Sequence, residues 1–263
     1  MSSAPSAPPL HCTPRLSVSA VVPARDEQGS IAQVVSELLA LRWPDGQRVV
    51  DEVIVADNGS KDDTARLARQ AGATVVPVAR AGYGRACWHG AQAARGQTLL
   101  FVDGDGAALT HQALWLLSTT NAGAAMAIGH RTAPEPGAMS WTQRFGNAFA
   151  CLLMRRLWDM PDRDLGPFRA IHRAAYRLLD LQDRGFGWTV EMQVRAHRMG
   201  MHTVHVPVSW RARTSGRSKV GGSLPGAVRA GLAILGVIGS VWLRERRRPP
   251  SPSAFTQPKK EPK

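Results

Sequence analysis

The N-terminal part of the chain alternates between short apolar runs and amphipathic stretches, and this alternation limits the possible folds more than any other feature. Short apolar runs are typical of buried strands, and apolar residues three and four positions apart are typical of helices with one buried face. Strand and helix in repeated alternation predict a parallel sheet with right-handed crossovers in an α/β domain. The expected strands cover residues 18–23, 53–56, 74–78 and 98–102.

Polar residues and glycines mark the ends of the helices between these strands. Ser30 is expected to cap the first helix, and Ser60 and Asp63 have the spacing of a capping box at the start of the second. Glycine after a helix is a common stop signal. The expected helices run from Gly29-Ser30 to Leu41, from Ser60 to Gly72 and from Gly82 to Arg95.

Two carboxylates follow the fourth expected strand, in Asp103-Gly104-Asp105-Gly106. Side chains at i and i+2 of a strand point the same way, and hard oxygen ligands with little else suit Mg²⁺ or Mn²⁺, which complete their shell with water and phosphate. A simple turn is the alternative, because Asp-Gly pairs are common in turns. An EF-hand is excluded, since Ala108 and Leu114 stand where that loop needs Gly and Glu.

Polar residues also follow the first two expected strands, at 24–27 and 57–60. Ligands of parallel sheets bind at the carboxyl ends of the strands, so these clusters should meet the two aspartates there. The chain has neither the glycine fingerprint of dinucleotide-binding folds nor a P-loop. The sequence therefore predicts a site that holds a diphosphate through metal and basic side chains.

The net charge of +13 is uneven: residues 1–130 carry 10 Lys and Arg against 11 Asp and Glu, and residues 131–263 carry 23 against 9. Such asymmetry indicates an anionic partner, which could be nucleic acid, an anionic membrane surface or a phosphorylated substrate. The three cysteines have no metal-ligand spacing, which suggests small buried thiols in a reducing compartment. Residues 1–16 lack the features of a signal peptide and are expected to be a disordered lead.

From about residue 17 to 221 the chain resembles the family 2 glycosyltransferases of the GT-A fold, in particular the dolichyl-phosphate mannosyltransferase-like group. The motifs occur in family order, and together they are more specific than any one alone. They are Val21-Val22-Pro23-Ala24-Arg25-Asp26-Glu27, Val55-Ala56-Asp57-Asn58-Gly59-Ser60-Lys61-Asp62-Asp63-Thr64, Gly82-Tyr83-Gly84, Asp103-Gly104-Asp105-Gly106, Asp164-Leu165-Gly166-Pro167-Phe168-Arg169, Gly187-Trp188-Thr189-Val190-Glu191 and Gly216-Arg217-Ser218-Lys219. The resemblance implies a Rossmann-like, mostly parallel sheet flanked by helices, with a C-terminal apolar helix.

The resemblance also implies roles for individual residues. Asp103 and Asp105 match the family's metal site, with Gly104 between them at the substrate. The implied donor contacts are Pro23, Ala24 and Glu27 around the nucleoside and Asp57 at the base, and the implied phosphate contacts are Arg131 after the fifth strand, Arg144 on the next helix, and Arg213 and Lys219 in a closing loop. Two positions depart from the family pattern: Asn58 replaces an Asp, and Ala107 stands where a Gln often lies near the metal.

The remaining basic and aromatic residues have simpler interpretations. Arginines on helices are usually solvated, histidines at irregular spacing form no metal triad, and tryptophans usually belong to the core. We therefore expect solvent-exposed Arg155, Arg156, Arg173, Arg177, Arg195 and Arg198, surface or packing roles for His197, His202 and His205, and core positions for Trp188 and Trp210.

The resemblance implies an inverting, metal-dependent hexosyltransferase that uses a nucleoside-diphosphate sugar, with polyprenyl (dolichyl or undecaprenyl) phosphate as the expected acceptor. A lipid phosphate oxygen attacks without a strong base, whereas a hydroxyl of a soluble or glycan acceptor needs one, for which Asp164 and then Glu191 are the candidates. The non-enzymatic alternative is a basic nucleic-acid or membrane-binding protein. Carboxylates at three strand ends disfavour a nucleic-acid partner.

The C-terminal part is expected to form a separate segment after a catalytic domain at residues 17–222. Residues 224–243 are mostly apolar, and a basic cluster follows at 244–248. We expect a membrane-associating helix at 223–248 that attaches the protein peripherally to the cytoplasmic face of an anionic membrane. A single tilted span and a helix packed on the catalytic domain are the alternatives, and residues 249–263 are expected to be a disordered tail.

Overall fold

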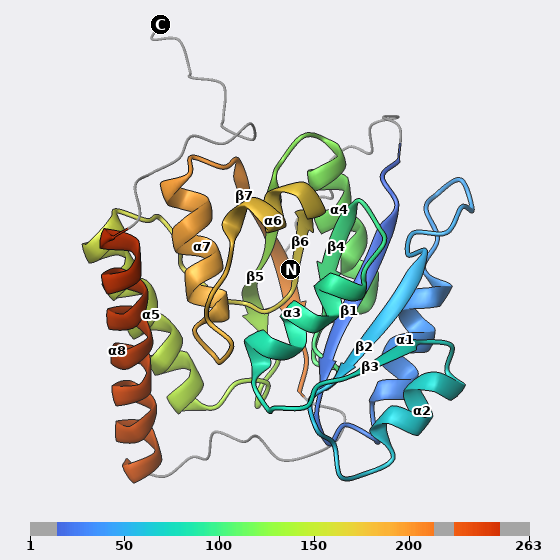
Figure 1. Cartoon of the computed structure of the whole chain (residues 1–263), viewed down its shortest axis with the longest axis horizontal. Helices are drawn as coiled ribbons and strands as arrows, with labels where there is room; N and C mark the ends of the chain where they lie inside the picture. The colour runs from blue at the N-terminus through green and yellow to red at the C-terminus, as the bar shows by residue number, and fades with distance from the viewer. Residues whose placement is uncertain (1–14, 213–223, 248–263) are drawn as a thin grey trace, which may run out of the picture.

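A computed structural model describes residues 15–212 and 224–247 of the chain. Seven strands form one sheet in the order β3-β2-β1-β4-β6-β5-β7, and helices cover both of its faces (Figure 1). The strands are β1 (Val18–Ala24), β2 (Glu52–Asp57), β3 (Thr74–Pro77), β4 (Thr98–Phe101), β5 (Met126–Pro134), β6 (Arg169–His172) and β7 (Thr203–Trp210). The helices are α1 (Ile31–Ala40), α2 (Thr64–Gln70), α3 (Tyr83–Ala93), α4 (Ala113–Asn121), α5 (Trp141–Trp158), α6 (Arg173–Leu179), α7 (Trp188–Arg198) and α8 (Leu224–Arg246), with a 3-10 turn η1 (Thr110–Gln112) before α4.

The predicted parallel sheet is confirmed for the N-terminal half, where β1 pairs in parallel with β2 and β4, and β2 pairs in parallel with β3. The C-terminal half adds β6, which runs antiparallel to both β4 and β5, and β7, which is parallel to β5. The sheet is therefore mostly parallel with one reversed strand. Arg131, expected after the fifth strand, lies inside β5, because this strand continues to Pro134.

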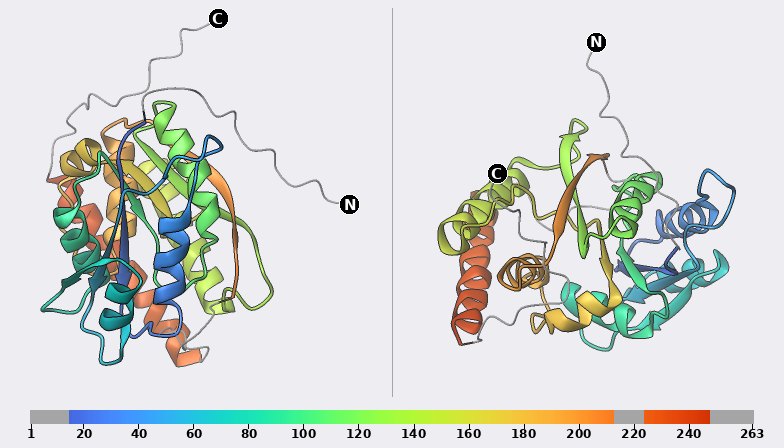
Figure 2. Two further views of the ribbon diagram at one scale, coloured as in Figure 1. Left: turned by 90° about the vertical axis from the view of Figure 1, so that its right-hand side faces the viewer. Right: turned by 90° about the horizontal axis from the view of Figure 1, so that it is seen from above.

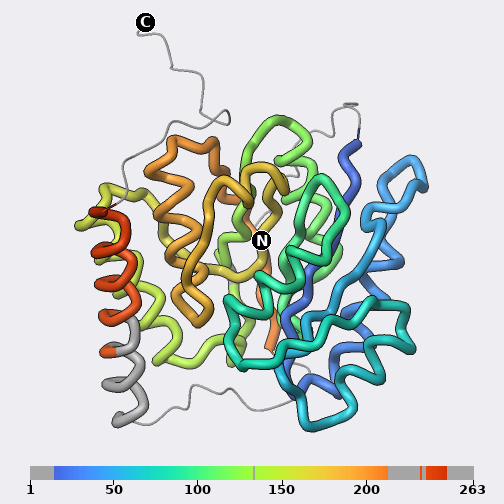
Figure 3. The backbone as a smooth tube through the Cα atoms, viewed as in Figure 1, coloured from blue at the N-terminus to red at the C-terminus, as the bar shows by residue number. Residues whose placement is uncertain are grey.

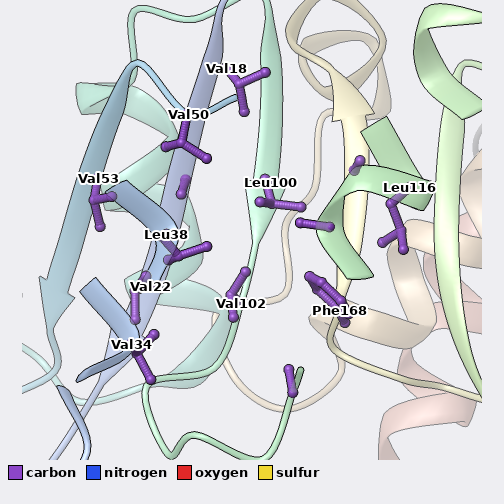
Figure 4. Close-up of a cluster of buried hydrophobic side chains, with 14 of the residues drawn as sticks. Val18, Val22, Val34, Leu38, Val50, Val53, Leu100, Val102, Leu116 and Phe168 are labelled. Atoms are coloured by element: carbon purple, nitrogen blue, oxygen red, sulfur yellow. The ribbon is translucent and has the colours of Figure 1, made fainter. Parts of the chain in front are cut away.

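The sheet separates two layers of packing. Side chains from α1 and α4 pack on one face, where Val34 and Leu38 meet Val22 and Leu100 (Figure 4). Residues of α3, α6 and α7 pack on the other face, against alternate residues of the same strands such as Val21. This alternation follows from the two-residue period of a strand and explains why the strands read as continuous apolar runs.

Two predicted helix caps are wrong, because the side chains have more distant partners. The Ser30 hydroxyl does not cap α1 and instead donates to the Gly104 carbonyl oxygen at 2.7 Å. The Ser60 hydroxyl accepts from the backbone N–H of Asp26 at 3.0 Å, and α2 begins only at Thr64. Both serines thus tie together loops at the carboxyl edge of the sheet.

Helix α8 forms a further layer with α5 and α7 (Figures 1 and 2). Ile238 and Val241 are buried in a cluster that includes Ala150 of α5 and Val194 of α7. Within the described residues, no helix is both long enough and apolar enough to cross a bilayer. The packed helix, an alternative at the sequence level, describes this segment, and membrane attachment remains a prediction.

Several expectations concern segments at the edges of the described residues. Most of the predicted lead and tail, and the loop with Arg213 and Lys219, lie outside them; these segments are grey in Figure 3. Arg15 belonged to the predicted lead, but its guanidinium donates to the Gln47 side chain at 2.9 Å. The prediction of small buried thiols is confirmed for Cys87 and Cys151.

Close packing of α3 on β1 gives a first testable prediction. A Cβ at Gly90 would lie 2.4 Å from Val21 Cγ1, so Gly90→Ala should lower the free energy of unfolding by about 1–3 kcal/mol through overpacking. The matched control is Gly239→Ala in α8, where no atom lies within 4 Å of the added methyl and higher helix propensity should contribute up to about 1 kcal/mol. Urea unfolding curves with equal midpoints for the two variants would contradict the packing argument.

Candidate active site

A cavity of about 360 Å³ lies at the carboxyl edge of the parallel strands. Its walls come from the residues after β1, β2 and β4, from the start of α3, from α5 and from the loop before α7. The lining residues are Pro23, Ala24, Arg25, Glu27, Asn58, Ala81, Gly82, Tyr83, Asp103, Gly104, Asp105, Gln143, Gly185 and Phe186. The three predicted strand-end clusters therefore meet in one pocket, as parallel-sheet geometry requires.

The loops after β1 and β2 are bound to each other beneath this pocket. Asp26 adopts a left-handed conformation with a φ of 54°, and its carboxylate accepts from the Lys61 N–H at 2.8 Å. The Glu27 N–H donates to the Thr64 hydroxyl at 2.8 Å. These contacts hold Glu27 at the pocket wall with little exposure to solvent. They require residues from both loops, which explains why the polar positions occur in two clusters.

Asn58, the departure from the family pattern, occupies the pocket, whereas Asp57 is not among the lining residues. The Asp57 carboxylate accepts from the Ser60 N–H at 3.1 Å, as a turn-forming aspartate does. Asn58 accepts from the Gly82 N–H at 2.8 Å and so connects the end of β2 to the start of α3. Contact between Asp57 and a base remains a prediction from the resemblance.

Both aspartates after β4 line the pocket, and each is fixed by a hydrogen bond. The Tyr83 hydroxyl donates to Asp103 Oδ1 at 2.9 Å, and the Ala107 N–H donates to Asp105 Oδ1 at 3.0 Å. Burial and the Asp103 carboxylate raise the pKa of Tyr83 well above its usual value, so the phenol keeps its proton. No group of three or more His, Cys, Asp or Glu side chains with metal-binding geometry occurs in the part of the chain that the structure describes. Two carboxylates with room for water and phosphate oxygens fit Mg²⁺ or Mn²⁺ rather than a site closed by protein ligands.

Arg131 and Asp164, both predicted to be catalytic, are bound to each other outside the pocket lining. Arg131 Nε and the Arg131 backbone N–H each donate to Asp164 Oδ2 at 2.9 Å. Only 13% of the Arg131 side chain and 4% of the Asp164 side chain are exposed. Through these hydrogen bonds from the backbone and the side chain of Arg131, the segment after α5 that contains Asp164 is held against β5.

The pair adjoins a buried polar network around Arg169, which is 0% exposed. Its guanidinium donates to the Gly166 carbonyl at 2.8 Å and to Gln193 Oε1 at 3.1 Å. Burial lowers the pKa of Arg169 to about 10, so it remains a cation at neutral pH. Gln193 in turn donates to Asp162 at 2.6 Å, and His205 lies 3.2 Å from the same carboxylate. The network joins β6, α7 and β7 behind the pocket.

Glu191 lies on α7 and is not among the pocket residues. Its carboxylate is 1% exposed and accepts from the backbone N–H groups of Gln182 and Asp183 at 2.9 and 2.7 Å. It therefore shapes the loop that carries Phe186. Arg144 is an exposed residue of α5, one position from the pocket residue Gln143.

Two of the arginines expected at solvated helix faces are instead paired. Arg195 and Arg198 of α7 contact Glu245 of α8 at 3.1 and 3.0 Å. Arg173 donates to the Ala94 carbonyl at 3.0 Å, whereas Arg155 and Arg156 are exposed as expected. The correction for Arg195 and Arg198 follows from the packed position of α8, which the sequence left as one of three alternatives.

Eight pocket residues were not predicted as site residues: Arg25, Asn58, Ala81, Gly82, Tyr83, Gln143, Gly185 and Phe186. Tyr83 could have been found from the Gly82-Tyr83-Gly84 motif beside a strand end, and Gln143 from the Ser140-to-Gln143 capping box, which the structure contains. Phe186 carries no comparable signal, since a single aromatic residue in a loop is not specific. It is 78% exposed at the pocket mouth and stacks on Tyr83 with ring centroids 6.3 Å apart.

Comparison with known proteins adds independent information on this arrangement. The family model described as Glycosyl transferase family 2 matches residues 19–179. An uncharacterized glycosyltransferase of Mycobacterium tuberculosis is 33% identical over 213 residues, which cover 81% of this chain and 94% of the relative.

Two solved structures share the fold. One is glucosyl-3-phosphoglycerate synthase from Mycobacterium tuberculosis, in complex with Mn²⁺, UDP-glucose and phosphoglyceric acid, with a TM-score of 0.64 and 24% identity over 86% of this chain and 80% of that chain. The other is mannosyl-3-phosphoglycerate synthase from Rubrobacter xylanophilus, with a TM-score of 0.71 and 20% identity over 92% of this chain and 80% of that chain. At these identities the likeness concerns the fold.

Proposed function

The chain belongs to glycosyl transferase family 2, and we propose that it transfers a hexosyl group from a nucleoside-diphosphate sugar to a small, water-soluble, anionic acceptor. The observation that carries the proposal is the pocket in which Asp103 and Asp105 meet the loops after β1 and β2. This pocket has the chemistry for a divalent cation and a diphosphate. The basic C-terminal half of the chain favours an anionic acceptor.

We propose that Asp103 and Asp105 hold Mn²⁺ or Mg²⁺. When bound, the cation neutralises charge that develops on the departing nucleoside diphosphate. The Tyr83 hydroxyl keeps Asp103 oriented, and the Ala107 N–H does the same for Asp105. The loops after β1 and β2 provide the wall for the nucleoside, with Glu27 and Asn58 as its polar groups.

Transfer with inversion requires the acceptor oxygen to attack the anomeric carbon opposite the departing diphosphate. A hydroxyl acceptor needs a proton acceptor, and the two candidate bases have other contacts: Asp164 binds Arg131, and Glu191 binds the loop 182–183. We propose that both act as positioning carboxylates, and that the proton of the attacking hydroxyl passes to a carboxylate or phosphate oxygen of the anionic acceptor itself. Arg144, Arg213 and Lys219 remain predicted phosphate contacts.

Polyprenyl phosphate and attachment to an anionic membrane remain expectations from the resemblance. A soluble acceptor has more support, because one structural neighbour was crystallised with phosphoglyceric acid and the other is named for the synthesis of mannosyl-3-phosphoglycerate. In addition, α8 buries Ile238 and Val241 against the catalytic domain, which leaves Leu232, Leu235 and Leu243 as the exposed large apolar side chains among its described residues.

A labelled-donor screen tests the proposal. UDP- and GDP-hexoses with Mn²⁺ would be offered together with 3-phosphoglycerate in one arm and with detergent-dispersed polyprenyl phosphate in the other. We expect metal-dependent transfer of label to 3-phosphoglycerate, measured as a new water-soluble product that anion-exchange chromatography separates from the donor. Label confined to the organic phase would overturn the soluble acceptor in favour of the lipid, and absence of transfer in every arm would reject the proposed acceptor and donor classes.

The contact between Tyr83 and Asp103 gives a prediction about the metal. Tyr83→Phe removes the 2.9 Å hydrogen bond and keeps the aromatic ring beside Phe186 and Trp188. Loss of such an outer contact weakens metal binding or activity by roughly 10- to 100-fold, so the Mn²⁺ concentration for half-maximal transfer should rise by about tenfold or more. The control is Tyr176→Phe, the same substitution at another buried tyrosine, whose ring packs on Phe101. An unchanged Mn²⁺ requirement in Tyr83→Phe would contradict the proposed role of Tyr83.

A further inference from the structure

The last turn of the C-terminal helix α8 carries two adjacent charged residues, Arg244 and Glu245, that contact different parts of the molecule. Glu245 is 4% exposed and pairs with Arg195 and Arg198 of α7. Arg244 points instead to the loop before α7, where its Nη2 lies 3.3 Å from Asp183 Oδ2 and its Nε lies 3.8 Å from Glu191 Oε1. The first contact fixes the helix on the domain. The second connects the helix to a loop that forms part of the pocket wall.

The loop 182–187 depends on these two carboxylates for its shape. Glu191 accepts from the N–H groups of Gln182 and Asp183, and Asp183 Oδ1 accepts from the Gly185 N–H at 2.8 Å. The pKa of Glu191 is raised, chiefly by burial and also by the neighbouring Asp183 charge. Hydrogen bonds from the backbone and the Arg244 charge offset part of this rise. Two carboxylates in this place repel each other, and the Arg244 guanidinium is the cation that compensates them.

The same loop is bonded to the start of α3 on its other side. The Gly84 N–H donates to the Gly185 carbonyl at 3.0 Å, and the Arg85 N–H donates to the Arg184 carbonyl at 2.9 Å. The contact is close: a Cβ at Gly84 would lie 2.7 Å from the Asp183 carbonyl oxygen. The position of the loop therefore fixes the position of the first turn of α3.

The first turn of α3 carries Tyr83, whose hydroxyl donates to Asp103 in the pocket. The loop itself contributes Gly185 and Phe186 to the pocket wall. A continuous series of contacts thus runs from the last turn of α8 through Asp183 and Gly185 to Tyr83 and Asp103. In Figures 1 and 2, α8 stands beside α5 and α7 at the edge of the domain, away from the parallel strands that end at the pocket.

We infer that Arg244 is a positioning residue of the active site: by compensating Asp183 and Glu191 it holds the loop 182–187, and with it the pocket wall at Phe186 and the orientation of Tyr83. The C-terminal helix is therefore part of the catalytic unit. The inference rests on the proposed function for its kinetic consequence. Its structural consequence, a loop held by α8, stands without any substrate.

The test compares variants at the two charged contacts of the same helix end. Arg244→Ala removes the contact to the loop, Arg244→Lys keeps a cation there, and Arg198→Ala weakens the Glu245 contact that fixes the helix. Arg247→Ala changes an exposed neighbour and serves as the surface control. Amide hydrogen exchange of residues 182–187 and 83–87 is measured in each purified full-length variant, and KM and kcat are measured with the hexose donor that the screen identifies.

We expect Arg244→Ala to speed exchange in both segments and to raise the donor KM by about tenfold with a smaller change in kcat, since the wall acts mainly on bound substrate. Arg244→Lys should restore most of the KM. Arg198→Ala should lower the thermal midpoint and leave the donor KM within about threefold of the wild type.

Two results would overturn the inference. One is wild-type exchange of both segments in Arg244→Ala, and the other is an equal rise of KM in Arg198→Ala, which would assign the effect to general loosening of α8. If the wild-type chain transfers no hexose, the proposed function fails, and the exchange data still decide whether Arg244 holds the loop.

Discussion

Asp105→Ala is expected to reduce hexosyl transfer by roughly 10³-fold or more while the protein stays folded, because it removes one of two carboxylates that can hold the cation. The side chain is 5% exposed and accepts a hydrogen bond from the Ala107 N–H at 3.0 Å. Its loss leaves one backbone donor without this partner, which costs about 1–3 kcal/mol of unfolding free energy. The effect on transfer should therefore far exceed the effect on stability.

The control for this prediction is Asp63→Ala, the same substitution at an exposed aspartate that pairs with Arg66 at 2.9 Å. It should leave both transfer and the thermal midpoint unchanged, since exposed ion pairs contribute little. Initial rates at saturating Mn²⁺ and donor, with circular dichroism of both variants, provide the measurement. Substantial activity of Asp105→Ala, or full activity of the wild type in EDTA, would contradict the assignment of Asp105 as a ligand of a metal needed for transfer.

Local apolar patterns were sufficient to predict the first four strands and the parallel half of the sheet. Val21 and Val22 illustrate why: they face opposite layers of the core, so a strand buried on both faces must be apolar throughout. The reversed direction of β6 was not predictable in this way. It depends on pairing with β4 and β5, which lie far away in sequence.

The contacts of the polar residues, unlike the strands, could not be predicted from local patterns, because they depend on partners distant in the sequence. Ser30 matches a helix cap by spacing, yet its hydroxyl bonds to the carbonyl of Gly104, which lies 74 residues later in the chain, after β4. Arg195 and Arg198 are typical of a solvated helix face until α8 places Glu245 against them. A sequence shows which residues can bond, whereas the tertiary contacts determine which bond forms.

The candidate site was predictable to the extent that strand ends position it. Asp103, Asp105, Glu27, Pro23, Ala24 and Gly104 all line the pocket. Asp164 and Glu191 also belong to family motifs, but they do not line the pocket, and their carboxylate oxygens accept hydrogen bonds from Arg131 and from Gln182. A motif therefore identified residues important to the region without distinguishing contact with substrate from support of the loops.

Asp164→Ala separates these two roles. The structure predicts a loss of about 3–5 kcal/mol of unfolding free energy, because Arg131 would keep its charge with no carboxylate beside it in a largely buried place. The backbone N–H of Arg131 would lose its acceptor at the same time. Unfolding by urea, followed by circular dichroism, measures this loss directly.

Coupling between the two residues sharpens the prediction. Replacing both members, as Arg131→Met with Asp164→Ala, removes the uncompensated charge, so the double variant should be more stable than the sum of the single variants implies. The exposed pair Asp63 and Arg66 is the reference, and its disruption should cost about 0–1 kcal/mol. If Asp164→Ala instead unfolds within about 1 kcal/mol of the wild type and still loses transfer, a contact with the reacting atoms explains the loss better than support of Arg131, since a largely buried ion pair cannot be broken at so small a cost.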